Sequence, residues 1–374
     1  MAVNPVNVVV MSVIRLLRSS DTDSSSDEEW YLEKKKRKLR SRIKDYTQLT
    51  TLYTADDFKS HFRLQRTTFE YILNIISSDL IRKTKGNEAI PSNKQFMIAV
   101  WKMATMDSYR SICDRFDVGR ATAVRAVRRV THALFKIAPH FISWPSNERA
   151  EIIVSKFKES SGFPNTIGAI DGTHIRIEAP NENAVDYINR KGYHSIQLQV
   201  VCDHRMVITH CYVGHPGSVH DQRVFRQSEV ALYLNDEEKF PFDSHIIGDS
   251  AYELHEHLLV PFKDNGHLTA AQKQYNFRQS SARVVIERCF AHLKGRMRSL
   301  MHCLPMKRVD LMAEYIVACC VIHNICLLRE DEITIIPIIS LTDDPMQNCH
   351  DNNQRQLNNN GIHKRNMVMH MLQR

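Results

Sequence analysis

The spacing of hydrophobic positions changes along the chain and divides it into segments. In the first half apolar side chains recur at helical spacing, as at Phe69 and Ile72. Farther on, short stretches that alternate between apolar and polar positions are typical of strands, and helical patterns follow them. The pattern predicts a helical segment over residues 55–150 and a mixed α/β segment over residues 151–330.

Neither end of the chain shows such a period. Residues 19–29 are acidic and serine-rich, and the C-terminal residues are rich in asparagine and glutamine, so neither can bury much apolar surface. The run KKKRKLRSR at 34–42 is typical of a nuclear-localisation or phosphate-contacting segment, although a solvated charged linker explains it equally well. We expect residues 1–54 and 331–374 to be disordered.

Three helices are predicted in the second part of the helical segment. Ser92 and Ser108 can cap the first two, and the third begins at Arg120 after the turn DVG at 117–119. A short helix, a glycine-containing turn and a longer helix form the layout of a helix-turn-helix. We therefore expect an N-terminal all-α, helix-turn-helix-like DNA-binding domain over 55–150.

The third of these helices carries the candidate DNA contacts. We expect its inward stripe to consist of Val124, Val127, Thr131 and Leu134. The arginines on or beside the outward face are Arg120, Arg125, Arg128 and Arg129. Guanidinium groups in such a row favour contact with the DNA backbone. Arginine is also an ordinary choice for the polar face of an amphipathic helix, so both interpretations stay open.

The second segment has the order of an RNase H-like core. The stretches TIGAIDGTHIRIEA, HSIQLQVVCD, VITHCYVG and HIIGDS are predicted strands, the second and third forming a hairpin. A helix is expected near 221–234, and SSARVVIERCFAHLKGRMRS reads as another. The predicted fold class is α/β, a retroviral-integrase-type mixed sheet that follows the helical domain.

Three carboxylates stand where this fold would aim them at one point. Asp171 and Asp249 close apolar runs, and Glu287 lies on the last helix of the core, beside a stripe of buried positions. Three converging like charges are costly unless a divalent cation lies between them. Two-metal phosphoryl transfer uses such oxygen ligands, with Asp171 bridging, Asp249 on the first ion and Glu287 on the second. The predicted cofactor is Mg²⁺ or Mn²⁺.

Each carboxylate also has a structural alternative. Asp171 with Gly172 could form a hairpin turn, Asp249 could cap a helix that starts near Ser250, and Glu287 could pair with Arg283. Neighbouring side chains add further candidates. Asp221 follows a turn after the third strand and could be an auxiliary metal ligand. Arg190 and Lys191, just before the second strand, could hold phosphate at the same edge.

A zinc site is a second candidate for metal binding. Cys202, His204, His210 and Cys211 supply four zinc-ligand side chains within ten residues. The alternation of a β-hairpin explains the same residues, and we favour the hairpin.

Bulk composition narrows the class of protein only slightly. A net charge of +8 in 374 residues suits a nucleic-acid partner without requiring one. The nine cysteines lack the spacing of a disulfide scaffold, so we expect a reducing compartment. The stretch YIVACCVIHNICLL has 14 residues and is shorter than a membrane span, so we expect a buried helix and no membrane association.

Five segments, in order, resemble the PIF/Harbinger family of DDE transposases and the nucleases derived from them. These segments are DGTHIRI, YINRKGYHSIQLQVVCD, GSVHDQRVF, GDSAYEL and VIERCFAHLKGRMR. The resemblance implies a metal-dependent DDE nuclease domain over 151–330, with Asp171, Asp249 and Glu287 as the triad and Asp221 as the additional aspartate. It also implies DNA as substrate, a nuclear or nucleocytoplasmic location, and a Myb-like partner protein. A homo-oligomer is a separate expectation, and the sequence leaves the oligomeric state open.

Two other functions stay open beside a DNA-cleaving nuclease. The chain could be a DNA-binding or adaptor protein that has kept the fold and lost catalysis, or it could be a transposase that still moves DNA. One sequence does not show whether the carboxylates are retained for cleavage.

Overall fold

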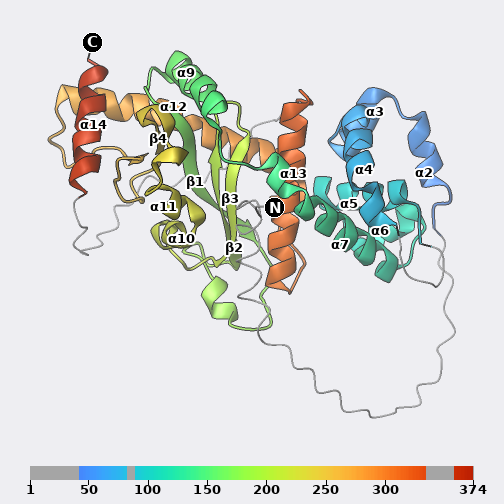
Figure 1. The fold of residues 1–374 in the computed structure, drawn as a ribbon. Coiled ribbons are helices and arrows are strands. Elements are labelled where there is room, and N and C mark those ends of the chain that lie inside the picture. The colour runs from blue at the N-terminus through green and yellow to red at the C-terminus, as the bar shows by residue number, and fades with distance from the viewer. Residues whose placement is uncertain (1–41, 82–88, 334–357, 374) are drawn as a thin grey trace, which may run out of the picture.

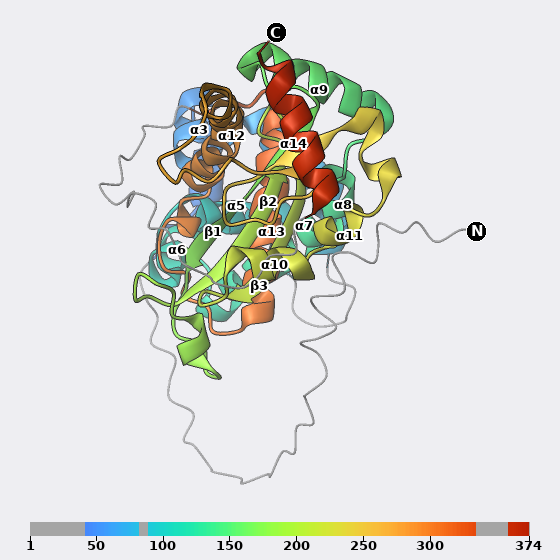
Figure 2. The ribbon, with the colours of Figure 1, turned by 90° about the vertical axis from the view of Figure 1, so that its left-hand side faces the viewer.

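A computed structural model describes residues 42–81, 89–333 and 358–373. The expected disorder of residues 1–41 and 334–357 lies outside these ranges, as does most of the basic run. Figure 1 shows helices α2 to α7 at one end of the molecule, the sheet at the other, and α13 between them. In Figure 2, turned by 90°, the helical region lies behind the sheet.

One five-stranded mixed sheet forms the centre of the second half, in the order β3-β2-β1-β4-β5. The strands β1, β2 and β3 are antiparallel neighbours, whereas β4 and β5 run parallel to β1. The four predicted strands and their order along the chain are confirmed, whereas the short strand β5 was not predicted. The strands are β1 (Thr166–Arg176), β2 (Ser195–Cys202), β3 (Ile208–Pro216), β4 (His245–Ile247) and β5 (Leu258–Leu259).

Helices account for most of the remaining described residues. The α-helices before the sheet are α2 (Tyr46–Leu49), α3 (Ala55–Phe62), α4 (Arg66–Leu80), α5 (Ser92–Ala104), α6 (Tyr109–Phe116), α7 (Arg120–Lys136), α8 (Ala138–Phe141) and α9 (Asn147–Ser161). The later ones are α10 (Asp221–Gln227), α11 (Glu229–Tyr233), α12 (Ala270–Arg296), α13 (Val309–Leu328) and α14 (Asn359–Met371). The 3-10 helices are η2 (Thr50–Leu52), η3 (Ala184–Tyr187), η4 (Glu237–Lys239), η5 (Pro241–Asp243) and η6 (Arg298–Leu300).

Both faces of the sheet are covered by helices. Because strand side chains alternate between faces, Ala169 packs in the core with α12 and α13, and its neighbour Ile170 packs with α10 and α11. Val200 and Val201 divide in the same way on β2. Every residue of β2 is buried, which explains the strand's nearly continuous apolar sequence.

The helical region and the sheet share one hydrophobic core. This core runs from Tyr46 in α2 to the helices that cover the sheet, and α7 packs against α13. The expected boundary at residue 150 falls inside α9, which itself packs against β1 and α12. The sequence pattern therefore located the helices correctly, whereas a separate N-terminal domain does not describe how they pack.

Two segments expected to be disordered are ordered in part. Tyr46 in α2 is buried, and edge-to-face packing of its ring against Trp101 and Phe116 holds that helix in place. In the expected tail, α14 lies beside α12 (Figure 1). Lys364 of α14 donates hydrogen bonds from Nζ to the backbone oxygen and Oδ1 of Asp243, at 2.8 and 2.7 Å. Tertiary contacts of this kind are invisible to local composition.

The details of the helix-turn-helix prediction have mixed outcomes. Helix α7 begins at Arg120 as expected, and the Ser108 hydroxyl accepts the capping bond from the Ser111 N–H of α6. The Ser92 cap is wrong, because α5 starts at Ser92 itself and Pro91 precedes it. The inward stripe is also shifted. Small alanines pack inward beside Val127, Thr131 and Leu134, while Val124 is only half-buried.

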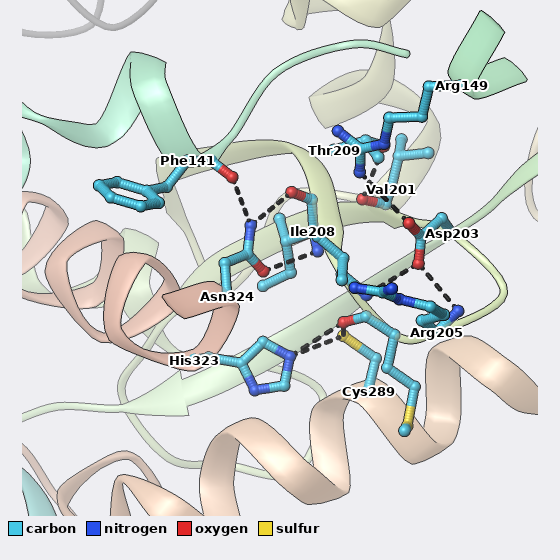
Figure 3. A network of polar contacts seen from close by, with 12 residues as sticks. Phe141, Arg149, Val201, Asp203, Arg205, Ile208, Thr209, Cys289, His323 and Asn324 are labelled. Atoms are coloured by element: carbon cyan, nitrogen blue, oxygen red, sulfur yellow. Dashed lines mark hydrogen bonds and ion pairs between the residues drawn. The ribbon is translucent and has the colours of Figure 1, made fainter. Parts of the chain in front are cut away.

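Helix α13 is longer than the predicted stretch. Its 20 residues are apolar enough to cross a membrane, but 78% of its apolar window is buried inside the protein, as in the core helix of a globular fold. Asn324 of α13 bonds both backbone groups of Ile208 at the start of β3 and the carbonyl oxygen of Phe141 (Figure 3). His323 bonds the carbonyl of Met206 in the β2–β3 turn. These bonds fix the hairpin against the helix.

Candidate active site

Asp171 lies in the middle of the central strand. It pairs with Val200 across to β2, so the interpretation of residues 171–172 as a hairpin turn is wrong. Its Oδ1 accepts a hydrogen bond from the Gly172 N–H at 2.7 Å, and its side chain is 20% exposed. The strand thus holds this carboxylate rigidly and largely out of water.

Asp249 follows β4, the strand parallel to β1. Its Oδ1 accepts a hydrogen bond from the Ala251 N–H at 2.9 Å in a turn, and no helix begins at Ser250, so the helix-cap alternative is wrong. Gln279 of α12 donates from Nε2 to the Gly248 carbonyl at 2.7 Å. That bond fastens the Glu287-bearing helix to the end of the Asp249 strand.

Glu287 is joined to Asp171 through one arginine. Arg283, one turn earlier on α12, contacts the Asp171 Oδ2 from Nη1 at 3.0 Å and the Glu287 Oε1 from Nη2 at 2.9 Å. The expected alternative pairing of Glu287 with Arg283 is therefore present, but the arginine is shared with the first carboxylate. The Glu287 side chain is 55% exposed, so it faces solvent more than the sequence pattern indicated.

Asp221 approaches Asp171 from the other side of the strand. It is the first residue of α10, and a Cβ placed on Gly172 would lie 2.8 Å from its Oδ1. Only a residue without a side chain allows so close an approach. Asp221 thus reaches β1, the strand that carries Asp171.

The electrostatics show that the three aspartates act on one another. Burial, followed by the negative charge of Asp249, raises the pKa of Asp171 to about 7, and the Arg283 guanidinium opposes the rise. Burial and Asp249 also raise the pKa of Asp221. The pKa of the buried Tyr252 hydroxyl is raised well above its usual value by burial and then by the charges of all three aspartates. Negative charge is concentrated here beyond what the protein's own cations neutralise.

The donor chemistry of this site fits a hard divalent cation, although the side chains do not surround one. Within the described ranges, no three His, Cys, Asp or Glu side chains are grouped closely enough to hold a metal ion. Arg283 occupies the position between Asp171 and Glu287 and supplies the positive charge there. Carboxylate oxygens are the ligands that Mg²⁺ and Mn²⁺ prefer. A cation could enter once the arginine side chain moves aside.

Several residues at this site were not identified from the sequence. Lys294 lies on α12 beyond Glu287, and its Nζ donates to the Thr173 Oγ1 at 2.6 Å; burial lowers its pKa to about 8. His174 Nδ1 lies 3.0 Å from the Ser195 Oγ. Both residues occur within the quoted motifs, and the signal that could have found them is their spacing from Asp171 and Glu287.

The candidate phosphate contacts divide into two groups. Arg190 reaches the acidic site, because its Nη2 lies 2.6 Å from the His220 Nδ1. Its charge opposes the rise in the pKa of Asp221 that burial and Asp249 cause. Lys191 lies close enough to His174 to lower the pKa of that imidazole, after burial and Lys294. The four arginines of α7 belong to the helical region instead. Arg120, Arg125 and Arg128 are exposed, and Arg129 is half-buried.

The candidate zinc ligands do not converge. Cys202 lies against Cys289 of α12, whereas His210 pairs with Glu229 at 3.1 Å and Cys211 lies against Cys320 of α13. The hairpin, with its turn at residues 203–207, is the correct interpretation of this stretch.

Comparisons with known proteins show a family likeness over most of the chain. Residues 170–324, which include all four carboxylates, match the DDE superfamily endonuclease family. The rat protein named Putative nuclease HARBI1 is 31% identical over 78% of this chain and 83% of its own. The Arabidopsis thaliana protein named Antagonist of Like Heterochromatin Protein 1 is 31% identical over 73% and 75%.

A more distant relative is a probable transposase of insertion sequence element IS702 from Microchaete diplosiphon, 24% identical over 64% of this chain and 84% of its own. No solved structure matches the chain. The match to the rat nuclease extends beyond the sheet into the helical region, since it covers 301 residues. The chain therefore belongs to the DDE endonuclease superfamily, among the Harbinger transposase-derived nucleases.

Proposed function

We propose that this protein is a divalent-metal-dependent nuclease that cleaves DNA phosphodiester bonds at the edge formed by β1, β4 and α12, in an RNase H-like core. The observation that carries the proposal is the arrangement of four carboxylates. Burial, and then the charge of Asp249, raises the pKa of Asp171 and of Asp221, and Glu287 is linked to Asp171 by a single arginine.

We assign the carboxylates different roles according to how rigidly each one is held. Asp171 and Asp249, held by the strand and by the turn after β4, would bind one cation, and Glu287 on the longer side chain would bind a second. Such cations stabilise the attacking and leaving oxygens of an in-line displacement when bound. Asp221 would orient the loop after β3 and add a ligand. Water or a 3′ hydroxyl is the nucleophile that this site would use.

Arg283 has a separate part in the proposal. In the structure it neutralises Asp171 and Glu287, the two groups that must be free to bind a cation. Once displaced, its guanidinium lies one helical turn from Glu287 and suits a DNA phosphate, as does Arg190 beside His220. The same side chain would thereby stabilise the metal-free site and contact the substrate.

The proposed cellular location rests on the sequence alone. The basic run 34–42 and the net charge of +8 suit a nuclear protein that binds DNA, with the cytoplasm as a second location. The Myb-like partner rests on the family resemblance alone, and the homo-oligomer stays an expectation.

A second candidate function is a non-catalytic chromatin or DNA adaptor. It is favoured by one observation, that a 31%-identical relative bears a name describing antagonism of a heterochromatin protein rather than cleavage. A third is active transposition, in line with the name of the Microchaete relative. Retention of all four carboxylates favours the nuclease.

A plasmid-nicking assay separates these functions. Purified protein with Mg²⁺ or Mn²⁺ should nick supercoiled DNA, and EDTA should stop it. Asp171→Asn should abolish nicking, while Asp236→Asn, a substitution on the β3 side of the molecule, should leave it unchanged. Equal nicking by wild type and Asp171→Asn, purified in parallel, would overturn the assignment of this site.

A further inference from the structure

A second charged feature lies away from the carboxylates, between α7 and the start of α13. It is a hollow of about 260 Å³, which we call the α7 hollow. Three segments far apart in sequence enclose it: the start of α6, one face of α7, and the stretch from residue 305 into α13. Its lining residues are Tyr109, Arg120, Val124, Val127, Arg128, Thr131, Pro305, Met306, Lys307, Arg308, Leu311, Glu314 and Tyr315.

The rim of the α7 hollow is cationic. Among the residues that the structure describes, Arg120, Arg128 and Lys307 make no ion pair within 4 Å, and all three are exposed. Arg308, by contrast, is engaged with Asp310, which neutralises its charge. Glu314 is the acidic lining residue, and it lies 3.7 Å from His132. Three positive charges therefore line the opening with no ion-pair partner in the described ranges.

The floor of the hollow is apolar and partly aromatic. Val124, Val127 and Leu311 form it, with the half-buried ring of Tyr109 at one side. Arg120 and Arg128 both lie close enough to act on the Tyr109 hydroxyl, yet burial dominates and raises its pKa to about 12. The surface suits a ligand with an anionic part and a flat apolar part.

The hollow is attached directly to the catalytic strand. Leu304, next to the lining residue Pro305, forms a parallel bridge with Ile177, and its N–H donates to the Arg176 carbonyl at 2.9 Å. Arg176 ends the strand that carries Asp171. Arg176 is five residue steps along the strand from Asp171, which is roughly 17 Å at the usual rise per residue. A nucleic acid at the active site could thus extend to the hollow.

We propose that the α7 hollow binds one unpaired nucleotide of the nucleic-acid strand, with its phosphate on Arg120, Arg128 and Lys307 and its base on the apolar floor. The proposal deepens the proposed nuclease function, on which it rests for the identity of the strand. A cavity of this volume is below the range of drug-sized ligands and holds a single base, whereas a duplex cannot enter it. A base that stacks on an aromatic ring does so without strong sequence preference, and Tyr109 is the aromatic side chain beside the apolar floor.

Binding in the hollow and insertion of α7 into the DNA major groove would use different arginines of this helix. A helix inserted in the major groove would use the outward arginines of α7 together, including Arg125. Arg125 is exposed on the same helix but does not line the hollow, and neither does Arg129. Arg125→Gln is therefore a matched control for Arg120→Gln and Arg128→Gln.

The test is binding of labelled DNA in EDTA, so that cleavage plays no part. Two duplexes are compared: one fully paired, and one with a single bulged 2-aminopurine, whose fluorescence reports the surroundings of the unpaired base. Wild type should bind the bulged duplex about tenfold more tightly and change its fluorescence. Arg120→Gln, Arg128→Gln and Lys307→Gln should each remove most of that preference and lower the salt slope by about one.

A variant of the floor completes the test. Val124→Trp should fill the hollow and abolish the preference while binding to the paired duplex is kept; thermal unfolding checks that each variant is folded. Equal affinity of wild type for the two duplexes, or an effect of Arg125→Gln as large as that of Arg120→Gln, would overturn the proposal. Asp171→Asn should retain the full preference, which separates failure of the hollow from failure of the nuclease site.

Discussion

The acidic site and the α7 hollow are both attached to β1, yet they are built in opposite ways. The carboxylates are partly buried, and the strand, a turn and one arginine hold Asp171, Asp249 and Glu287. In the hollow, by contrast, Arg120, Arg128 and Lys307 are exposed and carry no ion pair in the described part of the chain. The fold fixes the carboxylates of the proposed cleavage site. The exposed cations proposed to contact a nucleic-acid strand of any sequence keep their side-chain mobility.

This contrast has an energetic side. Concentrating buried negative charge costs stability, because each carboxylate is desolvated and repels the next. Exposed arginines cost little and contribute little until a ligand arrives. Changing the acidic site should therefore alter both stability and catalysis, and changing the hollow should alter binding alone.

The largest expected effect separates rate from binding. Asp249→Asn should lower the cleavage rate at saturating DNA by about a hundredfold or more, since a ligand to the proposed ion is lost. Arg128→Gln should leave that saturated rate within about threefold and raise the DNA concentration needed to reach it. Single-turnover cleavage across a range of protein concentrations measures both. A lowered saturated rate in Arg128→Gln would remove the distinction between the two regions.

The second prediction concerns pH. The pKa of Asp171 in the folded protein is about 7, against 3.8 in the unfolded chain, so the folded state holds this proton more tightly. The stabilisation is fully present below about pH 3.8 and is lost as the pH rises to about 7, on the order of 2–4 kcal/mol.

Chemical denaturation in EDTA between pH 4 and 8 measures that slope. The free energy of unfolding of Asp171→Asn should change less with pH over this window and should exceed that of wild type at pH 8. Arg128→Gln should follow the wild-type curve. Parallel curves for wild type and Asp171→Asn would contradict the charge repulsion inferred for the site.

The third prediction uses the close approach at Gly172. Gly172→Ala should destabilise the protein by about 1–3 kcal/mol and lower cleavage, because the new methyl group would displace the carboxylate of Asp221. Ala121→Gly on exposed α7 serves as a control, with a loss of about 1 kcal/mol and normal cleavage. Unchanged cleavage by a folded Gly172→Ala protein would exclude Asp221 from the site.

The smallest effect is expected at the C-terminal helix. Lys364→Met keeps the length of the side chain but removes its bonds to Asp243, and should cost about 1–2 kcal/mol. Denaturant unfolding measures the loss, and Lys158→Met on α9 is an exposed control. No loss at Lys364 would mean that α14 does not dock as the structure describes.

The sequence predicted the parts of this fold that depend on local periodicity. The alternating strands, their order and the positions of Asp171 and Asp249 follow from such patterns. It did not predict α14, whose docking depends on Asp243, more than 100 residues away. It also could not show that Arg283 bridges two carboxylates, because one of its partners, Asp171, is 112 positions distant.

The α7 hollow also depends on contacts between distant segments that the local sequence does not show. The sequence pattern grouped the four arginines of α7 as one surface, since they share a helix. The structure separates them, because residues 305–308 reach back and enclose only Arg120 and Arg128. Which side of a helix is covered is decided by segments far along the chain.

Calorimetric titration with Mn²⁺ measures whether Asp171, Asp249 and Glu287 bind a divalent cation once Arg283 gives way. Wild type should show saturable binding, Asp171→Asn none at the same concentrations, and Asp236→Asn normal binding. Arg283→Gln should bind Mn²⁺ about as tightly as wild type or more tightly, because the competing cation is gone. Undiminished binding by Asp171→Asn would contradict the account.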